Sequence, residues 1–203
     1  MTGRNQYGWT DSQATCAHSY LVPSVLSALP SGRLRIADIG SGNGYLAGVL
    51  ASRGHAVAGI EASEDGVAQA RAAHPTIQFE QISIYDDVAA AIGRDFDVAV
   101  ATEVVEHLVR PRELFRAALS ILKPGGCLVI TTPYHGYVKN LALAITGRMD
   151  RHFLAEWDGG HIKFFSVTTL RRMAEQAGVK RVRFTFAGRV PLLWKSMVLI
   201  GEK

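Results

Sequence analysis

Two carboxylates and an imidazole lie close together in the segment TEVVEH, residues 102–107. If this segment is helical, spacings of three and four positions place Glu103, Glu106 and His107 on one face. Such a set could bind an octahedral divalent cation such as Mg²⁺, Mn²⁺ or Fe²⁺, and His161, 54 positions after His107, could complete it. His107 could instead act as a general base, because an imidazole ionises near neutral pH. These roles compete, since a metal-bound nitrogen cannot accept a proton.

A plain structural explanation of the same segment also exists. Acidic side chains are favoured at the start of a helix, where the backbone dipole is positive, and the imidazole would then simply pack against its neighbours.

The second motif is rich in glycine and reads DIGSGNG over residues 38–44. Glycines permit a tight turn and let backbone N–H groups approach a ligand closely. The spacing is GxGxG rather than the dinucleotide pattern GxGxxG, and no Lys-Ser/Thr pair follows, as a P-loop requires. Glu61 comes 17 positions after Gly44, where a carboxylate can accept hydrogen bonds from a ribose diol. The two features together predict a ligand that contains ribose.

The elements that must position these motifs alternate between strand-like and helix-like segments. Apolar runs predict strands at residues 35–39, 56–60, 77–82, 96–101 and 127–131. Periodicity and end signals predict helices at residues 45–53, 66–73, 111–123 and 167–177. This alternation predicts an α/β fold with a parallel sheet covered on both faces, and ligands bind at the carboxyl ends of its strands. Residues 182–186 and 196–202 have no helix between them and should form an antiparallel pair.

Residues 133–162 do not follow this alternation. A thirty-residue interruption in a compact domain predicts a lid or binding insert on the substrate side. The insert is rich in aromatic, basic and apolar residues, so it could line an acceptor pocket or make a peripheral contact with a lipid surface. Because repeats, linkers and low-complexity tracts are absent from the sequence, residues 1–203 are predicted to form a single domain.

Composition excludes several classes of protein. The chain has 203 residues, of which 48% are hydrophobic and 20% charged, as in an ordinary globular domain. It has neither an apolar run of about 18 residues for a membrane span nor the apolar core of an export signal. Cys16 and Cys127 lie far apart and outside any CxxC pattern, so we expect reduced thiols and a cytoplasmic location.

The net charge of +4 is unevenly distributed. Residues 1–100 carry 6 Lys and Arg against 10 Asp and Glu, whereas residues 101–203 carry 16 against 8. A basic second half favours an anionic substrate, nucleic acid or an anionic membrane surface as partner, although a solvated surface would carry the same charges.

Residues 38–44, Glu61, the strand at 97–101 and the segment LKPGG at 122–126 together resemble class I S-adenosylmethionine-dependent methyltransferases. The resemblance covers residues 34–132. It implies a Rossmann-like sheet of seven strands in the order 3-2-1-4-5-7-6, with strand seven antiparallel. It also implies that residues 1–32 form a helical lid region that folds over the cofactor, S-adenosyl-L-methionine.

The same resemblance assigns cofactor contacts to individual residues. Gly40, Gly42 and Gly44 would lie against the methionine part of the cofactor, Glu61 would bind the ribose hydroxyls, and Asp38 would orient the loop. Further contacts would come from Ser41, Asn43, Ala62, Thr102 and Glu103. This sequence departs from the family pattern after the third strand, where many members hold the adenine amino group with an acidic residue. Here Ser83, the backbone of Ile84 or Asp86 could serve.

The pattern ExxEH with a later histidine narrows the resemblance. It is similar to that of ubiquinone-biosynthesis O-methyltransferases and of RNA 3′-terminal 2′-O-methyltransferases, whose substrates present vicinal oxygens that can chelate a metal. We therefore predict O-methylation of a small-molecule catechol or diol, with Glu103, Glu106, His107 and His161 as both the catalytic residues and the candidate metal ligands. Alternatives are N-methylation, methylation of RNA 3′ ends and a non-catalytic cofactor sensor. We do not expect nucleic acid as a partner, because the sequence shows no RNA-binding module, and no oligomeric state is predicted.

Overall fold

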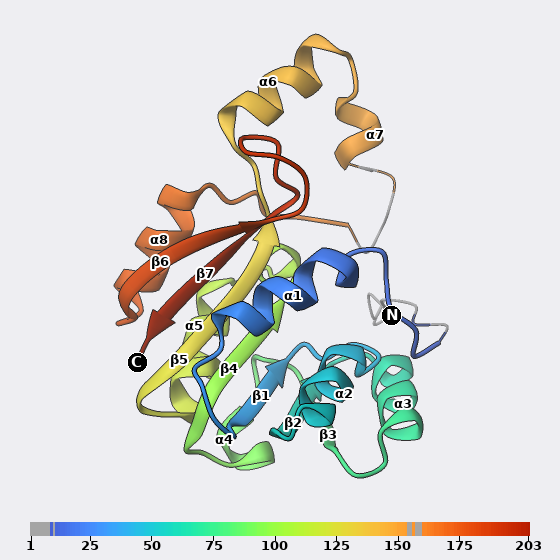
Figure 1. Ribbon diagram of the computed structural model, residues 1–203, viewed down its shortest axis with the longest axis vertical. Helices are drawn as coiled ribbons and strands as arrows, with labels where there is room; N and C mark the ends of the chain where they lie inside the picture. The colour runs from blue at the N-terminus through green and yellow to red at the C-terminus, as the bar shows by residue number, and fades with distance from the viewer. Residues whose placement is uncertain (1–8, 10, 154–155, 157–159) are drawn as a thin grey trace.

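The structure is a computed structural model that describes residues 9, 11–153, 156 and 160–203. Seven strands form one sheet in the order β3-β2-β1-β4-β5-β7-β6 (Figure 1). The strands are β1 (Arg35–Ile39), β2 (Ala56–Glu61), β3 (Gln78–Gln81), β4 (Phe96–Thr102), β5 (Leu122–Pro133), β6 (Lys180–Ala187) and β7 (Ser196–Glu202). Neighbouring strands among β1–β5 pair in parallel, whereas β7 is antiparallel to both β5 and β6. The predicted fold class, strand order and terminal antiparallel pair are confirmed.

Helices cover both faces of the sheet (Figure 1). They are α1 (His18–Ala28), α2 (Tyr45–Ser52), α3 (Glu64–Ala73), α4 (Val88–Ile92), α5 (Arg112–Ile121), α6 (Tyr137–Ile145), α7 (Met149–Phe153) and α8 (Val167–Gln176). Helices α1, α2 and α3 pack on one face, and α4, α5 and α8 pack on the other. Successive strand residues point to opposite faces, so Val98 and Val100 contact the first group while Ala99 and Ala101 contact the second. This two-sided burial is why the strands are nearly continuous apolar runs.

Side-chain caps set the starts of three helices. Ser63 accepts a hydrogen bond from the Gly66 N–H, so α3 begins at Glu64, two residues before the predicted start. Asp87 caps α4 in the same way, and Ser166 forms a capping box with Thr169 at the start of α8. Such caps satisfy backbone donors that have no partner within the helix.

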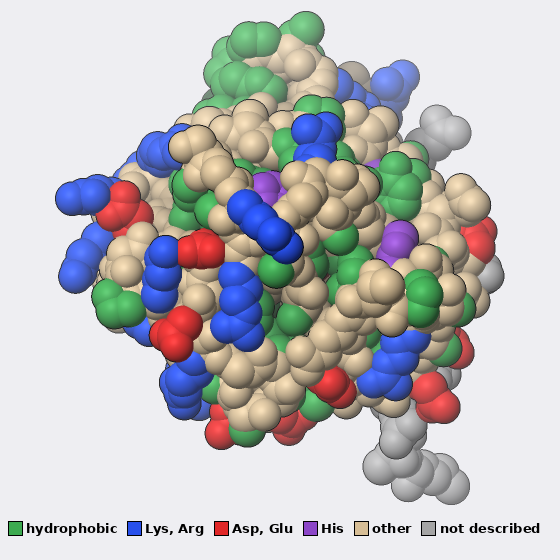
Figure 2. Space-filling model, turned by 60° about the horizontal axis from the view of Figure 1, so that its bottom comes forward, with side chains coloured by type: hydrophobic (Ala, Val, Ile, Leu, Met, Phe, Trp, Pro, Cys, Tyr) green, Lys and Arg blue, Asp and Glu red, His purple; other side chains and the backbone are tan. Residues whose placement is uncertain are grey.

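The predicted insert extends the fold beyond the carboxyl edge of the sheet. Strand β5 runs to Pro133, and α6 and α7 then project away from the sheet (Figure 1). Hydrophobic side chains gather at this end of the molecule (Figure 2). Those exposed on α6, α7 and the β6–β7 loop are Tyr137, Val138, Leu141, Ile145, Met149, Val190, Leu192 and Leu193. We call these eight residues the apolar cap.

Some predicted segments lie partly outside the described residues. These are positions 1–8 and 10 of the predicted lid region and positions 154–155 and 157–159 of the insert. Among the helices that the structure describes, none is both long and apolar enough to cross a membrane.

Candidate active site

The glycine loop connects β1 to α2 at the carboxyl edge of the sheet. Gly40, Gly42 and Gly44 have φ angles of +75°, +52° and +79°, a left-handed conformation that residues with a Cβ atom adopt only at a cost. A Cβ atom on Gly42 would also lie 2.4 Å from the ring of Trp9. Gly40 and Ser41 donate backbone hydrogen bonds to the Ile60 carbonyl, which ties the loop to β2. Glycine is therefore required at these positions both by the backbone conformation and by the close packing of neighbouring side chains.

Two carboxylates face this loop. Asp38 is 1% exposed, and neither of its carboxylate oxygens has a hydrogen-bond partner among the described residues. Burial, with a contribution from Glu61, raises the pKa of Asp38 to about 7. Glu61 accepts hydrogen bonds from the backbone N–H groups of Gly42 (2.9 Å) and Ser63 (2.8 Å). An unpartnered buried carboxylate is costly, so Asp38 is suited to bind a cation or a hydrogen-bond donor of a ligand.

An N-terminal segment, residues 11–17, lies across the glycine loop. The side-chain amide of Asn43 donates hydrogen bonds to the carbonyls of Asp11 (2.9 Å) and Gln13 (3.0 Å). Trp9, just before this segment, packs on the backbone of Gly42 and Gly66. Asn43, predicted as a cofactor contact, thus fastens this segment to the loop.

Replacing Asn43 with alanine should loosen this segment. Loss of two hydrogen bonds is expected to lower the free energy of unfolding by about 1–2 kcal/mol, and amide protons of residues 11–17 should exchange faster. Hydrogen exchange followed by mass spectrometry measures the effect, with Ser52→Ala at the other end of α2 as the control. Unchanged exchange in this segment would contradict the role of Asn43.

The other predicted cofactor contacts follow the carboxyl ends of neighbouring strands. Ala62 is exposed after β2, and Thr102 is half-buried at the end of β4. After β3, Ile84 is buried, and the Ser83 N–H donates to the carboxylate of Asp86 at 2.9 Å. All of these residues lie at the same edge of the sheet as the glycine loop.

The acidic pair after β4 departs from the expected geometry. Glu103 has a φ angle of +52° and precedes a single turn of 3₁₀ helix, Val105–His107, so the prediction of one helical face for all three residues was wrong. The reason lies in β5, because the Glu103 N–H donates to Thr131 and the Glu103 carboxylate accepts from the Thr131 hydroxyl at 2.8 Å. The Thr132 hydroxyl donates to Glu106 at 3.0 Å.

Burial disfavours the charge of both carboxylates, and the hydrogen bonds from Thr131 and Thr132 offset only part of this effect. Burial raises the pKa of Glu103 to about 7. The pKa of Glu106, which is 1% exposed, is raised well above its usual range by burial and by the nearby Glu103. A carboxylate with a pKa near neutrality can accept a proton from a reacting group at physiological pH.

Two histidines complete the cluster. His107 Nδ1 lies 3.2 Å from the Gly160 carbonyl, and because a carbonyl only accepts, Nδ1 carries the proton and Nε2 is the basic nitrogen. The backbone N–H groups of Ile162 and Lys163 both donate to the Glu106 carbonyl at 3.0 Å. These two hydrogen bonds hold the segment that carries His161, and the centre of the His161 ring lies 4.9 Å from the centre of the His107 ring.

The cluster has the composition of a small metal site. Glu106, His107 and His161 each offer one ligand atom, and these atoms lie within 4.8 Å of one another. Burial and the neighbouring His107 lower the pKa of His161 to about 4, so its imidazole is neutral at pH 7, as a metal ligand must be. The structure thus brings together three of the four predicted ligands, and Glu103 lies outside this group.

Comparison with known proteins identifies the family. Residues 14–183 match a family model described as a methyltransferase domain. The chain therefore belongs to the class I S-adenosylmethionine-dependent methyltransferases. A solved S-adenosylmethionine-dependent methyltransferase from Mesorhizobium loti is 22% identical and superimposes with a TM-score of 0.70, covering 89% of this chain and 96% of that one.

Two curated relatives of this methyltransferase are named ubiquinone biosynthesis O-methyltransferase. The protein from Dinoroseobacter shibae is 34% identical over 155 residues, which make up 73% of this chain and 61% of the relative. The protein from a Ruegeria species is 33% identical over 172 residues, or 82% and 68% of the two chains. The methyltransferase thus spans about two thirds of the length of these relatives.

Several residues that shape the site of this methyltransferase were not predicted from the sequence. Thr131 and Thr132 hold the two carboxylates from the end of β5. Ser196 also acts on this site, because its side chain lowers the pKa of both Glu103 and Tyr20 against the larger effect of burial. The signal for the threonines was present in the sequence, as two polar residues that end a buried apolar run. Ser196 reaches the site only through the pairing of β5 with β7.

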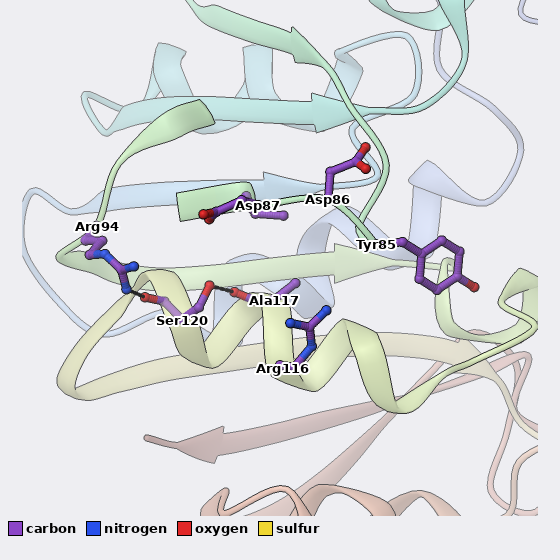
Figure 3. Close-up of a pocket in the computed structure, with 8 residues that line it drawn as sticks. Tyr85, Asp86, Asp87, Arg94, Arg116, Ala117 and Ser120 are labelled. Atoms are coloured by element: carbon purple, nitrogen blue, oxygen red, sulfur yellow. Dashed lines mark hydrogen bonds between the residues drawn. The ribbon is translucent and has the colours of Figure 1, made fainter. Parts of the chain in front are cut away.

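A polar cavity of about 350 Å³ lies between α4 and α5, and Asp86, one of the candidates for the adenine contact, is among its lining residues (Figure 3). Its charged groups already have partners within the protein. Asp87 caps α4, Arg94 donates to the Ser120 carbonyl at 2.8 Å, and Arg116 pairs with Glu113. These three side chains therefore need no ligand to satisfy their charges.

Proposed function

We propose that this chain transfers the methyl group of S-adenosylmethionine to a hydroxyl oxygen of a small molecule. The observation that carries the proposal is the cluster of two carboxylates and two imidazoles at the carboxyl end of β4, at the same edge of the sheet as the glycine loop. Methyl transfer is an in-line displacement, so the protein must align the acceptor oxygen and remove its proton.

The residues around the glycine loop fit the cofactor. The unpartnered Asp38 carboxylate calls for a cationic or hydrogen-bonding group, and the cofactor carries an ammonium group. Glu61 is fixed at the end of β2, where its remaining lone pairs are available to ribose hydroxyls. When bound, the cofactor supplies the electrophilic methyl group.

The carboxylates and imidazoles would act at the acceptor. Glu103, whose pKa is raised to about 7, and Nε2 of His107 are the groups suited to take the hydroxyl proton. Glu106 and His161 would orient the acceptor through their hydrogen-bonding atoms. A metal-free active site of this kind needs only proximity and a route for the proton.

The donor set of Glu106, His107 and His161 also fits a divalent cation. One Glu106 carboxylate oxygen is buried without a hydrogen-bond partner among the described residues, and imidazole and carboxylate donors suit Mn²⁺ or Fe²⁺. When bound, the metal would lower the pKa of a chelated hydroxyl. A divalent cation bound by these three residues is thus an additional component of the proposed site.

The names of the two curated relatives support oxygen as the accepting atom. Methylation of RNA 3′ ends or of nitrogen and a sensor role stay alternative hypotheses. A cytoplasmic location and a peripheral membrane contact stay predictions, and for the latter the candidate surface is the apolar cap.

Calorimetric titration of S-adenosylhomocysteine into chelator-treated protein tests the proposal, with NAD as the control. We expect micromolar affinity for S-adenosylhomocysteine and none for NAD. Methyl transfer from labelled cofactor to 3,4-dihydroxybenzoate, with and without Mg²⁺ or Mn²⁺, then tests the acceptor and the metal. Absence of S-adenosylhomocysteine binding in both the presence and the absence of metal would refute the proposal.

A further inference from the structure

A second cavity, of about 570 Å³, lies between α6, α7 and the β6–β7 loop. Its lining combines an apolar wall, including Leu143 and Leu193, with the cationic side chains of Lys139, Arg148 and Arg189. The lining contains no Asp or Glu side chain within the described part of the chain. We call this cavity the basic pocket.

Among the described residues, no carboxylate forms an ion pair with the cationic side chains of the basic pocket, although Glu103 interacts electrostatically with Lys139. None of the ion pairs found among the described residues involves Lys139, Arg148 or Arg189. The Lys139 residue is 6% exposed, and its ammonium donates to the Tyr134 carbonyl at 2.8 Å. A buried ammonium that bonds only to a neutral carbonyl is poorly compensated, and two further cations in the same cavity increase the local positive potential.

Lys139 links the basic pocket to the active site. Its ammonium donates to the carbonyl of Tyr134, two residues after Thr132, whose hydroxyl donates to Glu106 of the cluster. It also interacts electrostatically with Arg189 in the pocket. Burial, and secondarily Arg189, lower the pKa of Lys139 to about 8, so the ammonium form still predominates at pH 7. One ligand bound in the pocket could therefore extend to the acceptor position.

We propose that the acceptor carries an anionic group, a carboxylate or a phosphate, that binds to Lys139, Arg148 and Arg189 while its apolar body lies against Leu143 and Leu193. This inference rests on the proposed methyl transfer to a small molecule and narrows its substrate class. Charge-assisted hydrogen bonds to arginine are the strongest of the contacts such a ligand would make.

Two ligands of similar shape, one anionic and one neutral, test whether binding depends on the negative charge of the ligand. The dissociation constants of 3,4-dihydroxybenzoate and of its neutral methyl ester are measured by calorimetry with protein saturated in S-adenosylhomocysteine. We expect the acid to bind at least tenfold more tightly than the ester. In the variant Arg148→Gln, Arg189→Gln, whose altered side chains are exposed, the ratio should fall to about one while the affinity for the ester stays unchanged. Arg53→Gln, at the far end of α2, should leave the ratio as in the wild type.

Competition by benzoate and by phenyl phosphate then shows which anion the basic pocket prefers. Equal binding of acid and ester, binding of neither, or a preference that survives in the double variant would overturn the inference. Because these are binding measurements, they do not depend on turnover. Selective binding of the acid without any methyl transfer would support the basic pocket while refuting hydroxyl methylation by the active-site cluster.

Discussion

Replacing Glu106 with glutamine is expected to reduce the rate of methyl transfer by about 10² to 10⁴ while the protein keeps its stability and its cofactor affinity. The magnitude is that of losing a positioned acid–base or orienting group. Stability should persist because burial already disfavours the Glu106 charge, and glutamine can still accept the hydrogen bond from Thr132 that Glu106 accepts at 3.0 Å. Turnover with labelled cofactor, thermal melting and S-adenosylhomocysteine titration measure the three quantities.

The matched control is Glu113→Gln, a surface change in α5 that removes an ion pair with Arg116. It should alter turnover by less than twofold, because exposed ion pairs contribute little. If Glu106→Gln retains wild-type turnover, the cluster does not act at the acceptor. If it loses cofactor affinity as well, Glu106 belongs to the cofactor site instead.

Asp38→Asn should stabilise the ligand-free protein and weaken cofactor binding at the same time. The pKa of Asp38 is raised in the folded state from 3.8 to about 7, so the folded protein holds a proton that the unfolded chain releases at lower pH. The stability that the protonated group provides is complete below about pH 4 and is lost as the pH rises to about 7. Asparagine does not ionise, so the gain in melting temperature should be small at pH 4 and largest above pH 7.

A nearby aspartate supplies a control of opposite sign. Asp97 accepts a hydrogen bond from the Arg35 N–H at 2.7 Å and pairs with Lys123, and these contacts lower its pKa. Asp97→Asn should therefore lower the melting temperature at neutral pH, with an effect that disappears in acid.

The second expected effect of Asp38→Asn is on cofactor binding. Affinity for S-adenosylhomocysteine should fall at least tenfold. Unchanged affinity would show that the Asp38 carboxylate does not face the cofactor.

Much of the fold could be predicted because local patterns and global topology agree. Each central strand is an apolar run closed by glycine or a polar residue, and the regular alternation with helices leaves few topologies. Helix α4, with five residues (Val88–Ile92), is too short to show a helical period. The bounds of α1 were not predicted either, since Pro23 lies inside that helix.

The candidate site was predictable where strand order or a recognised motif pattern brings its residues together, as it does for His161. The glycine loop and Glu61 follow consecutive strands, so topology alone places them together. The orientation of Glu103 depends on Thr131, which comes from another strand, and local spacing carries no trace of that contact. Lys139 lies on α6, in the insert. No periodic pattern in the sequence predicted a helix there.

Helices α6 and α7 stand outside the architecture that stabilises the protein. None of the three hydrophobic clusters contains a described residue of either helix, although the basic pocket is built largely from them. Substitutions there should therefore leave the free energy of unfolding nearly unchanged while altering which molecules are accepted. In evolution or in the laboratory, substitutions in this region can therefore change substrate selectivity without destabilising the hydrophobic core.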